Sequence, residues 1–376
     1  MQNRLSKNRW GAIVSALAIA ALLAIFAAPA GAATPAHGGH QGKHKHHRKP
    51  PPQRPTYWGA WIGPQLTGEQ PPWDMSSVSR FEELTGKGMS LLEFAAPFAD
   101  CSQSPCAFYH FPTYEMNVIR NYGAIPFFSW GSQSIPVPPD LNEPDFQLAD
   151  LASGAYDGYI REFAEAAREW GHPFFLRFDW EMNGDWFPWG EFANGNTPGS
   201  YVAAYRHVHD IFTSVGATNA TWAWCPYADV QHRFGPLARY YPGDAYVDWT
   251  CLDGFNWAKN GVNSQPWRSF DQIFNGSYRT ITRKLAPRKP MLLAEFASGG
   301  KSHRKAEWIT QMFKDLRSKY RRIRGLIWFE QIDRGVQWPI ESAPKVTEAF
   351  RNGIKAPGFR INQFSSALGG PVGPPS

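Results

Sequence analysis

The stretch PFFLRFDWE (173–181) decides the fold. Apart from Arg177, its residues are apolar on both faces of an extended chain up to Phe178, and two acids follow at Asp179 and Glu181. A strand that is apolar on both faces is typical of a parallel sheet covered by helices. The amphipathic residues 151–171 precede it and end at Gly171, where a helix C-cap glycine belongs. This segment therefore reads as a helix followed by a buried parallel strand.

Seven further runs of the same kind lie along the chain, at 57–63, 89–98, 124–131, 219–227, 251–257, 290–297 and 323–330. Helix-like segments separate them; in 305–323, for example, Trp308, Met312 and Leu316 recur every four residues, the spacing of one helix face. Eight alternations of strand and helix predict an α/β protein, a (β/α)8 TIM barrel, with one catalytic domain over 56–355. A doubly wound open sheet would need a glycine-rich phosphate turn after an early strand, and WGAWIGPQLTG (58–68) is not one.

The N-terminal residues differ in composition from the predicted barrel. A basic head precedes a long apolar run and a small-residue exit, which predicts a signal peptide over 1–33 and a secreted, extracellular protein. An uncleaved membrane anchor is the alternative, because the run approaches the length of a span. Residues 34–55 are rich in His, Lys and Pro and predict a disordered linker. Residues 356–376 form a C-terminal tail that we expect to be loose.

The basic character of the chain is confined to its N-terminus. Residues 1–55 hold eight Lys and Arg and no acid, so removing them from the formal net charge of +6 leaves about −2 for the rest. A near-neutral barrel predicts no nucleic-acid partner. The basic linker is expected to associate with an anionic cell envelope, although its five His leave binding of a transition metal as an alternative. In 57–376 no His, Cys and Asp cluster has the spacing of metal ligands, so we expect neither a metal nor an organic cofactor. The sequence does not indicate an oligomeric state.

Four cysteines fit an exported protein. Cys101 and Cys106 enclose the short loop SQSP, which a disulfide would staple. Cys225 and Cys251 fit two readings, a second disulfide or two buried small apolar residues.

Active sites of (β/α)8 barrels lie at the C-terminal ends of the strands, and two glutamates stand at such ends. Glu181 follows the fourth strand and Glu295 the seventh, on opposite sides of the barrel. Period-two alternation places Arg177, Asp179 and Glu181 on one face. Two convergent carboxyls about 5–5.5 Å apart perform retaining glycoside hydrolysis, in which one attacks the anomeric carbon and the other protonates the leaving oxygen. We therefore predict Glu181 and Glu295 as catalytic residues.

Aromatic and polar side chains near the strand ends predict a sugar-binding groove. Indole rings stack on the flat C–H faces of sugars without consuming their hydroxyl hydrogen bonds. We expect at least two of five tryptophans in the groove, and the others packed between barrel and helices. The predicted substrate contacts are Trp130, Arg177, Trp186, Trp189, Tyr227, Asn256, Trp257 and Trp328.

Over roughly residues 57–350 the chain resembles glycoside hydrolase family 26, a family of retaining (β/α)8 enzymes. RFDWEMNGDWFPW (177–189) resembles its acid/base motif, YYPGDAYVDWTCLDGFNW (240–257) its approach to strand six, and LLAEFAS (292–298) its nucleophile strand. The resemblance implies that Glu181 is the acid/base and Glu295 the nucleophile. It also implies a polysaccharide substrate. The first expectation is an endo-β-1,4-mannanase, and enzymes that cleave mixed-linkage β-glucan or β-1,3-xylan are the alternatives.

Two positions depart from the family pattern. Trp180 stands where the family usually has His, and Phe255 where it tends to have Tyr. An indole can donate a hydrogen bond or stack but cannot accept one, and Phe has no hydroxyl to offer the nucleophile. These departures leave open a second class of function, a non-catalytic carbohydrate-binding protein of the cell surface.

Overall fold

The computed structural model describes residues 51–376 except 229, 259–264 and 301–302. Within them, eight parallel strands form a closed barrel, because the first strand pairs with both the second and the last. The strands are β1 (Tyr57–Ile62), β2 (Leu91–Asp100), β4 (Ile125–Ile135), β5 (Phe174–Phe178), β6 (Ala220–Trp224), β7 (Trp249–Asn256), β8 (Met291–Ser298) and β9 (Ile323–Glu330). The predicted (β/α)8 barrel is confirmed.

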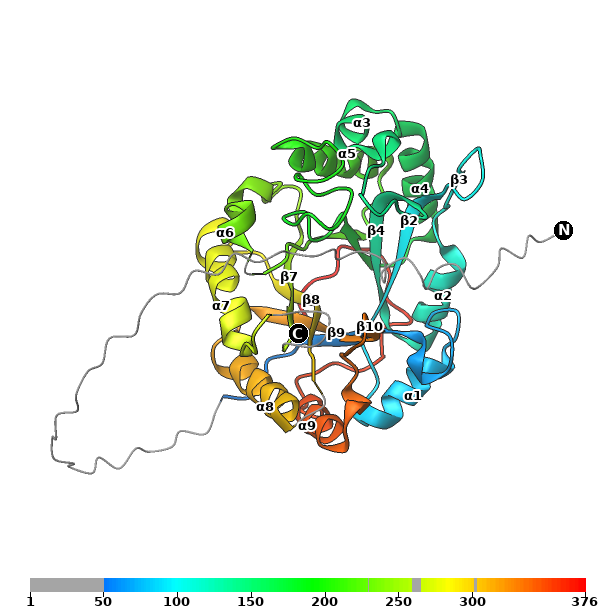
Figure 1. Ribbon diagram of the computed structural model, residues 1–376. Coiled ribbons are helices and arrows are strands. Elements are labelled where there is room, and N and C mark those ends of the chain that lie inside the picture. The colour runs from blue at the N-terminus through cyan, green and yellow to red at the C-terminus, as the bar shows by residue number, and fades with distance from the viewer. Residues whose placement is uncertain (1–50, 229, 259–264, 301–302) are drawn as a thin grey trace, which may run out of the picture.

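Helices surround this barrel (Figure 1). They are α1 (Ser76–Thr85), α2 (Thr113–Tyr122), α3 (Leu148–Ser153), α4 (Asp157–Trp170), α5 (Ser200–Val215), α6 (Gln231–Phe234), α7 (Phe270–Thr280), α8 (His303–Ser318) and α9 (Pro344–Ile354). The predicted helix over 151–171 is two helices, since Gly154 adopts a left-handed backbone between α3 and α4. Gly171 caps α4 in the same conformation, as expected.

Alternation along β5 decides which side chains enter the barrel. Phe174 packs outward on Trp170 of α4, whereas Phe175 meets Trp249 of β7 across the barrel interior. By the same alternation Arg177 points inward. The strand that suggested the fold thus delivers a charged side chain into the barrel interior.

Small elements follow the C-terminal ends of two barrel strands. The two-residue strand β3 (Ala107–Phe108) pairs antiparallel with β2, and a short hairpin of β10 (Ile332–Asp333) and β11 (Val336–Gln337) follows β9. Two disulfides are present, Cys101–Cys106 and Cys225–Cys251. The first was predicted, and the second decides between the two readings of Cys225 and Cys251.

The C-terminal residues are not loose. Trp249 Nε1 donates to the carbonyl of Val372 at 2.7 Å, and the amide of Val372 donates to Thr221 Oγ1 at 2.8 Å. The hydroxyl of Tyr57 donates to Gly373, and Arg324 donates to Pro375. These partners stand at the starts of four strands, so residues 369–376 cover the N-terminal end of the barrel, where Figure 1 shows the C-terminus. The expected loose tail is therefore corrected: backbone carbonyls that find buried donors are held in place.

The predicted signal peptide and nearly all of the linker lie outside the described residues. Among the residues that are described, none belongs to a helix with the length and hydropathy needed to cross a bilayer.

Candidate active site

The turn after β5 places Glu181 at the barrel mouth. The strand ends at Phe178, and Asp179 and Glu181 take positive φ angles of 44° and 53°. Such backbone costs a non-glycine residue about 1–3 kcal/mol and concentrates at functional sites. The amide of Glu181 donates to the carbonyl of Cys225 at 2.8 Å, which ties this turn to the end of β6.

The turn also corrects the expected face of Asp179. Because the strand has already ended, period-two alternation does not extend to this residue. Its carboxylate accepts 2.8 Å hydrogen bonds from the amide and hydroxyl of Ser132, on β4. Asp179 therefore anchors the turn to a neighbouring strand and does not join Arg177 and Glu181.

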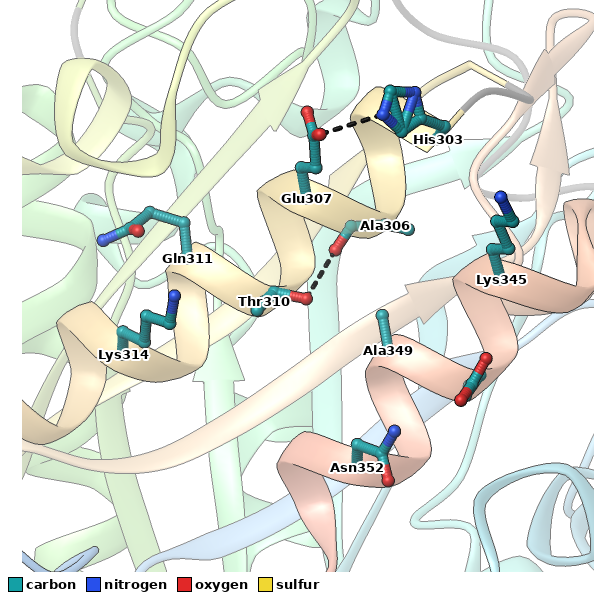
Figure 2. Close-up of a pocket in the computed structure, with 10 residues that line it drawn as sticks. His303, Ala306, Glu307, Thr310, Gln311, Lys314, Lys345, Ala349 and Asn352 are labelled. Atoms are coloured by element: carbon teal, nitrogen blue, oxygen red, sulfur yellow. Dashed lines mark hydrogen bonds and ion pairs between the residues drawn. The ribbon is translucent and has the colours of Figure 1, made fainter.

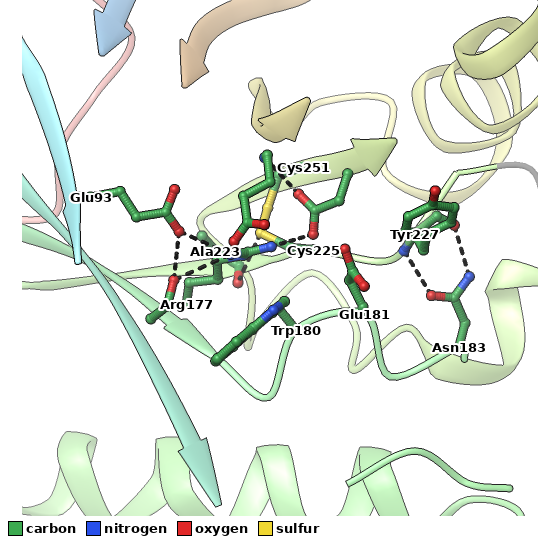
Figure 3. Close-up of polar contacts among 12 residues, drawn as sticks. Glu93, Arg177, Trp180, Glu181, Asn183, Ala223, Cys225, Tyr227 and Cys251 are labelled. Carbon is green, nitrogen blue, oxygen red and sulfur yellow. Dashed lines mark hydrogen bonds and ion pairs between the residues drawn. A yellow bond between two sulfur atoms is a disulfide. The ribbon is translucent and has the colours of Figure 1, made fainter. Parts of the chain in front are cut away.

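Arg177 is completely buried and holds three carboxylates from three other strands. Nη1 donates to Glu93 Oε1 of β2 at 2.9 Å and to Glu295 Oε1 of β8 at 2.6 Å, while Nη2 pairs with Asp253 of β7. Figure 3 shows Arg177 between Glu93 on one side and Glu181 on the other. A guanidinium stays charged in this setting, so it favours negative charge on the acids that contact it.

Asp253 orients Glu295 as well as pairing with Arg177. The amide of Glu295 donates to Asp253 Oδ1 at 2.8 Å, at a point where the pairing of β8 with its neighbours is irregular. Backbone and side chain of Glu295 are thus both fixed, and its side chain is 7 % exposed. A nucleophile needs this kind of fixed orientation toward the reacting carbon.

Burial raises the pKa of three acids at this site, Glu93, Glu181 and Asp253. Burial raises the pKa of Glu181 well above its usual value, and the charges of Asp253 and Glu295 raise it further, against the effect of Arg177. Burial likewise raises the pKa of Glu93, and that of Asp253 to about 7. Neighbouring carboxyls whose pKa values are pushed apart mark acid and base roles. The raised pKa of Glu181 favours its protonated form, whereas Glu295 is in direct contact with the guanidinium of Arg177.

Three half-buried aromatic side chains form a continuous series beside Glu181, here called the aromatic wall: Trp186, Tyr227 and Trp257. Trp186 Nε1 donates to Glu181 Oε2 at 2.5 Å, and its ring lies edge-on to Tyr227, 5.2 Å between centroids. Trp257 Nε1 donates in turn to the hydroxyl of Tyr227 at 3.3 Å. The structure brings these three predicted contacts together next to the proposed acid.

Four other predicted contacts lie in the core. Trp130 stacks on Phe163 of α4 with ring centroids 4.1 Å apart, and Trp328 packs on Trp308 of α8. Trp189 donates to the carbonyl of Trp180, and both atoms are buried. All three indoles are 0 % exposed, so these tryptophans offer no face to a sugar. Asn256 is buried too, where it donates to Ser298 and accepts from the amide of Arg268.

Two acids and one tryptophan of the site escaped the sequence prediction. Glu93 and Asp253 were visible as acids near strand ends, but only the barrel brings them to Arg177. The ring of Trp180 lies 5.0 Å from the guanidinium carbon of Arg177, so this departure from the family pattern places a cation–π contact beneath the arginine. The second departure, Phe255, packs 5.1 Å from Trp338 behind the aromatic wall.

One further residue outside the prediction connects two loops of the site. Asn183 donates to the carbonyl of Tyr227 at 2.9 Å and accepts from its amide at 2.8 Å. This pair of hydrogen bonds joins the loop that carries Glu181 to the start of the aromatic wall (Figure 3). In the part of the chain that the structure describes, no three His, Cys, Asp or Glu residues are grouped as a metal site.

A closed parallel barrel that carries Glu181 and Glu295 at the C-terminal ends of two of its strands is the architecture expected of a (β/α)8 glycoside hydrolase. Residues 148–289 match the model of glycosyl hydrolase family 26. The resemblance found in the sequence is confirmed.

Relatives extend the similarity along the chain. Endoglucanase H of Acetivibrio thermocellus is 31 % identical over 311 residues, 79 % of this chain and 30 % of the endoglucanase. A mannan endo-1,4-β-mannosidase of Bacillus subtilis is 24 % identical over 140 residues, 35 % of this chain and 38 % of that enzyme. The chain thus spans about a third of the length of these two relatives.

A solved structure shows the same fold. The modular endo-β-1,4-mannanase of Cellulomonas fimi superposes with a TM-score of 0.56 over 77 % of this chain and 69 % of that one, at 19 % identity. At this identity the likeness concerns the barrel alone.

Proposed function

We propose that this protein is a retaining glycoside hydrolase that cleaves a β-linked polysaccharide. The observation that carries the proposal is the contrast between two glutamates at one site, Glu181 with its raised pKa and Glu295 in contact with Arg177. Glu295 attacks the anomeric carbon while Glu181 gives its proton to the departing oxygen. Glu181 then takes a proton from the water that releases the sugar from Glu295.

For the substrate we propose a β-glucan that contains β-1,4 bonds. The endoglucanase matches 79 % of this chain, whereas the B. subtilis mannosidase matches 35 %. The sequence alone favoured β-1,4-mannan, which becomes the second candidate and is supported by that shorter match. β-1,3-Xylan is the third polymer that the sequence suggested.

The test is a measurement of reducing ends released by the purified protein. The substrates are mixed-linkage β-glucan, β-1,4-glucan, β-1,4-mannan and β-1,3-xylan. We expect the highest kcat/KM on one of the glucans. Higher kcat/KM on mannan would replace the first candidate by the second. Saccharide binding without product from any polymer would instead support the non-catalytic binding protein, which has no use for the contrast between Glu181 and Glu295.

We also propose that the protein is exported. Two disulfides support this, because such bonds persist in oxidising compartments outside the cytosol. The basic linker would then hold the enzyme near an anionic cell envelope. Fractionation of the producing cells tests both statements, with activity expected in the medium or released from the cell surface by salt.

A further inference from the structure

A buried lysine on α8 is not explained by the proposed chemistry. Lys305 is 0 % exposed, and lysines are almost never fully buried unless their ammonium group is paired. Its Nζ donates to three consecutive backbone carbonyls, those of Gln337, Trp338 and Pro339, each at 2.8 Å, and to Ser342 Oγ at 3.1 Å. The lysine thus closes the loop 337–342 around itself.

The acidic side chains near Lys305 are consistent with a lysine that holds loop 337–342. Glu330, at the end of β9, and Glu341, in the short helix Ile340–Ser342, are the acids that act on it, while burial lowers the pKa of Lys305 to about 7. Glu330 also accepts from the amide of Ile340, so the loop is held from two sides. Burying an amine is unfavourable unless it is paired. The hydrogen bonds that offset this cost at Lys305 also fix the geometry of the loop.

The loop held by Lys305 carries Trp338, which is 1 % exposed and cannot reach a ligand itself. Its ring lies edge-on to Trp257 with centroids 5.1 Å apart, and 5.1 Å from Phe255. Trp338 therefore supports the aromatic wall from behind. Trp257 thus has Trp338 on one side and its hydrogen bond to the hydroxyl of Tyr227 on the other.

We propose that Lys305 is a positioning residue that holds loop 337–342 so that Trp338 fixes Trp257 for sugar stacking. The inference rests on the proposed function. It assigns Lys305 to substrate binding and not to the chemical step. Lys305 has no contact with Arg177, Glu181 or Glu295 among the hydrogen bonds and ion pairs of the described residues. A change at Lys305 should therefore weaken substrate binding and leave the chemical step in place.

The experiment compares Lys305→Met with Lys314→Met in the full protein at pH 6, where Lys305 is protonated. Lys314 lies exposed farther along α8, beside a surface hollow of about 570 Å³ between α8 and α9 (Figure 2). We expect KM to rise about 3- to 10-fold in Lys305→Met, which corresponds to the loss of one aromatic contact with the sugar. The kcat should stay within 2-fold. Lys314→Met should leave both constants unchanged.

A double-substitution cycle gives a readout that a purely structural role would not move. If Lys305 acts through Trp257, then Lys305→Met adds no further rise in KM to Trp257→Ala. Additive effects of the two substitutions on KM would overturn the proposal. A fall of kcat with unchanged KM in Lys305→Met would overturn it too. Should Lys305→Met fail to fold, Trp338→Phe keeps the lysine contacts, and the same rise in KM is expected; an unchanged KM in that variant would equally overturn it.

Calorimetric titration with a cello-oligosaccharide separates the two proposals. If the wild-type protein binds but does not cleave, the proposed activity fails, while the effect of Lys305→Met on Kd still decides this inference. If the wild-type protein cleaves and the variant binds with unchanged Kd, only the inference fails. A wild-type protein that does not bind this oligosaccharide and cleaves none of the four polymers would remove both.

Discussion

At the residue scale, Glu181 can serve as an acid only because it is kept protonated where a surface glutamate would be ionised. Burial contributes most of this, and two neighbouring carboxylates add to it. Glu295 lies in the same site, yet its direct partner is a cation. In the proposed mechanism, the difference between these environments makes one of two chemically identical side chains the proton donor and the other the nucleophile.

Glu181→Gln removes the proton donor and keeps the shape. We expect kcat/KM on polysaccharide to fall about 10²- to 10⁴-fold, because the departing alkoxide is no longer protonated. An aryl β-glycoside with an acidic phenol needs no such help and should keep its rate of first bond cleavage. Glu307→Gln, on the exposed face of α8, is the matched control. Undiminished turnover of polysaccharide would remove Glu181 from this role.

The raised pKa of Glu181 also sets the direction of the pH dependence. The acid form is the active one, so kcat/KM should be sustained above the ordinary range of a glutamic acid and fall as the pH rises through the raised pKa. The aryl glycoside, whose first step needs no acid, should lack this alkaline fall when that step is measured. A polysaccharide profile that rises with pH across the same range would contradict the assignment.

Residue chemistry was the part of the site most open to prediction from sequence. Arg177 could be placed by strand alternation, and Glu181 and Glu295 by their positions at strand ends. The same alternation, applied to β4, would have turned Trp130 outward, because Ser129 beside it contacts Glu93 inside the barrel. Glu93 and Asp253 could not be assigned, since their role depends on which strands face one another across the closed barrel.

At the scale of elements, the turn after β5 holds the acid more firmly than a loop of its length suggests. Residues 179–183 are bonded to β4 through Asp179, to the end of β6 through the amide of Glu181, and to Tyr227 through Asn183. These bonds maintain two residues in left-handed backbone conformations. The sequence predicted a strand through residue 181, because nothing in its composition shows that positive φ angles begin at Asp179.

Asn183→Ala tests whether this turn positions Glu181. It leaves a part-buried amide and carbonyl of Tyr227 without these partners, and an unsatisfied group of this kind costs at most about 1–3 kcal/mol. We expect the midpoint of thermal unfolding to fall and kcat to drop by more than KM changes. Asn352→Ala, on exposed α9, should alter neither. A variant with wild-type kcat would show that Glu181 does not depend on this clamp.

At the scale of the whole molecule, the two ends of the barrel have separate tasks. Acids and aromatic residues occupy the C-terminal end of the strands, and residues 369–376 cover the opposite end. The alternation of eight strands and helices made the barrel predictable from sequence. The covering segment was not, because a Gly- and Pro-rich stretch has few apolar side chains, and it is held by its backbone carbonyls.

Deleting residues 369–376 exposes buried groups of Thr221 and Trp249 at the base of the barrel. We expect a loss of about 2–4 kcal/mol in the free energy of unfolding, from the unpaired groups alone. Because the site lies at the other end, kcat and KM at 25 °C should stay within 2-fold. Urea unfolding measures the first and initial rates the second. Unchanged stability would mean that the segment is not part of the fold.

The central claim is that Glu295 forms a covalent bond with the sugar while Glu181 handles the proton. A 2-deoxy-2-fluoro β-glycoside with a good leaving group slows the release of this intermediate, so the labelled residue can be found by mass spectrometry of the digested protein. We predict one label per molecule, on Glu295, and none in Glu295→Gln. A label on any other residue, or complete turnover of the reagent by Glu295→Gln, would contradict the account.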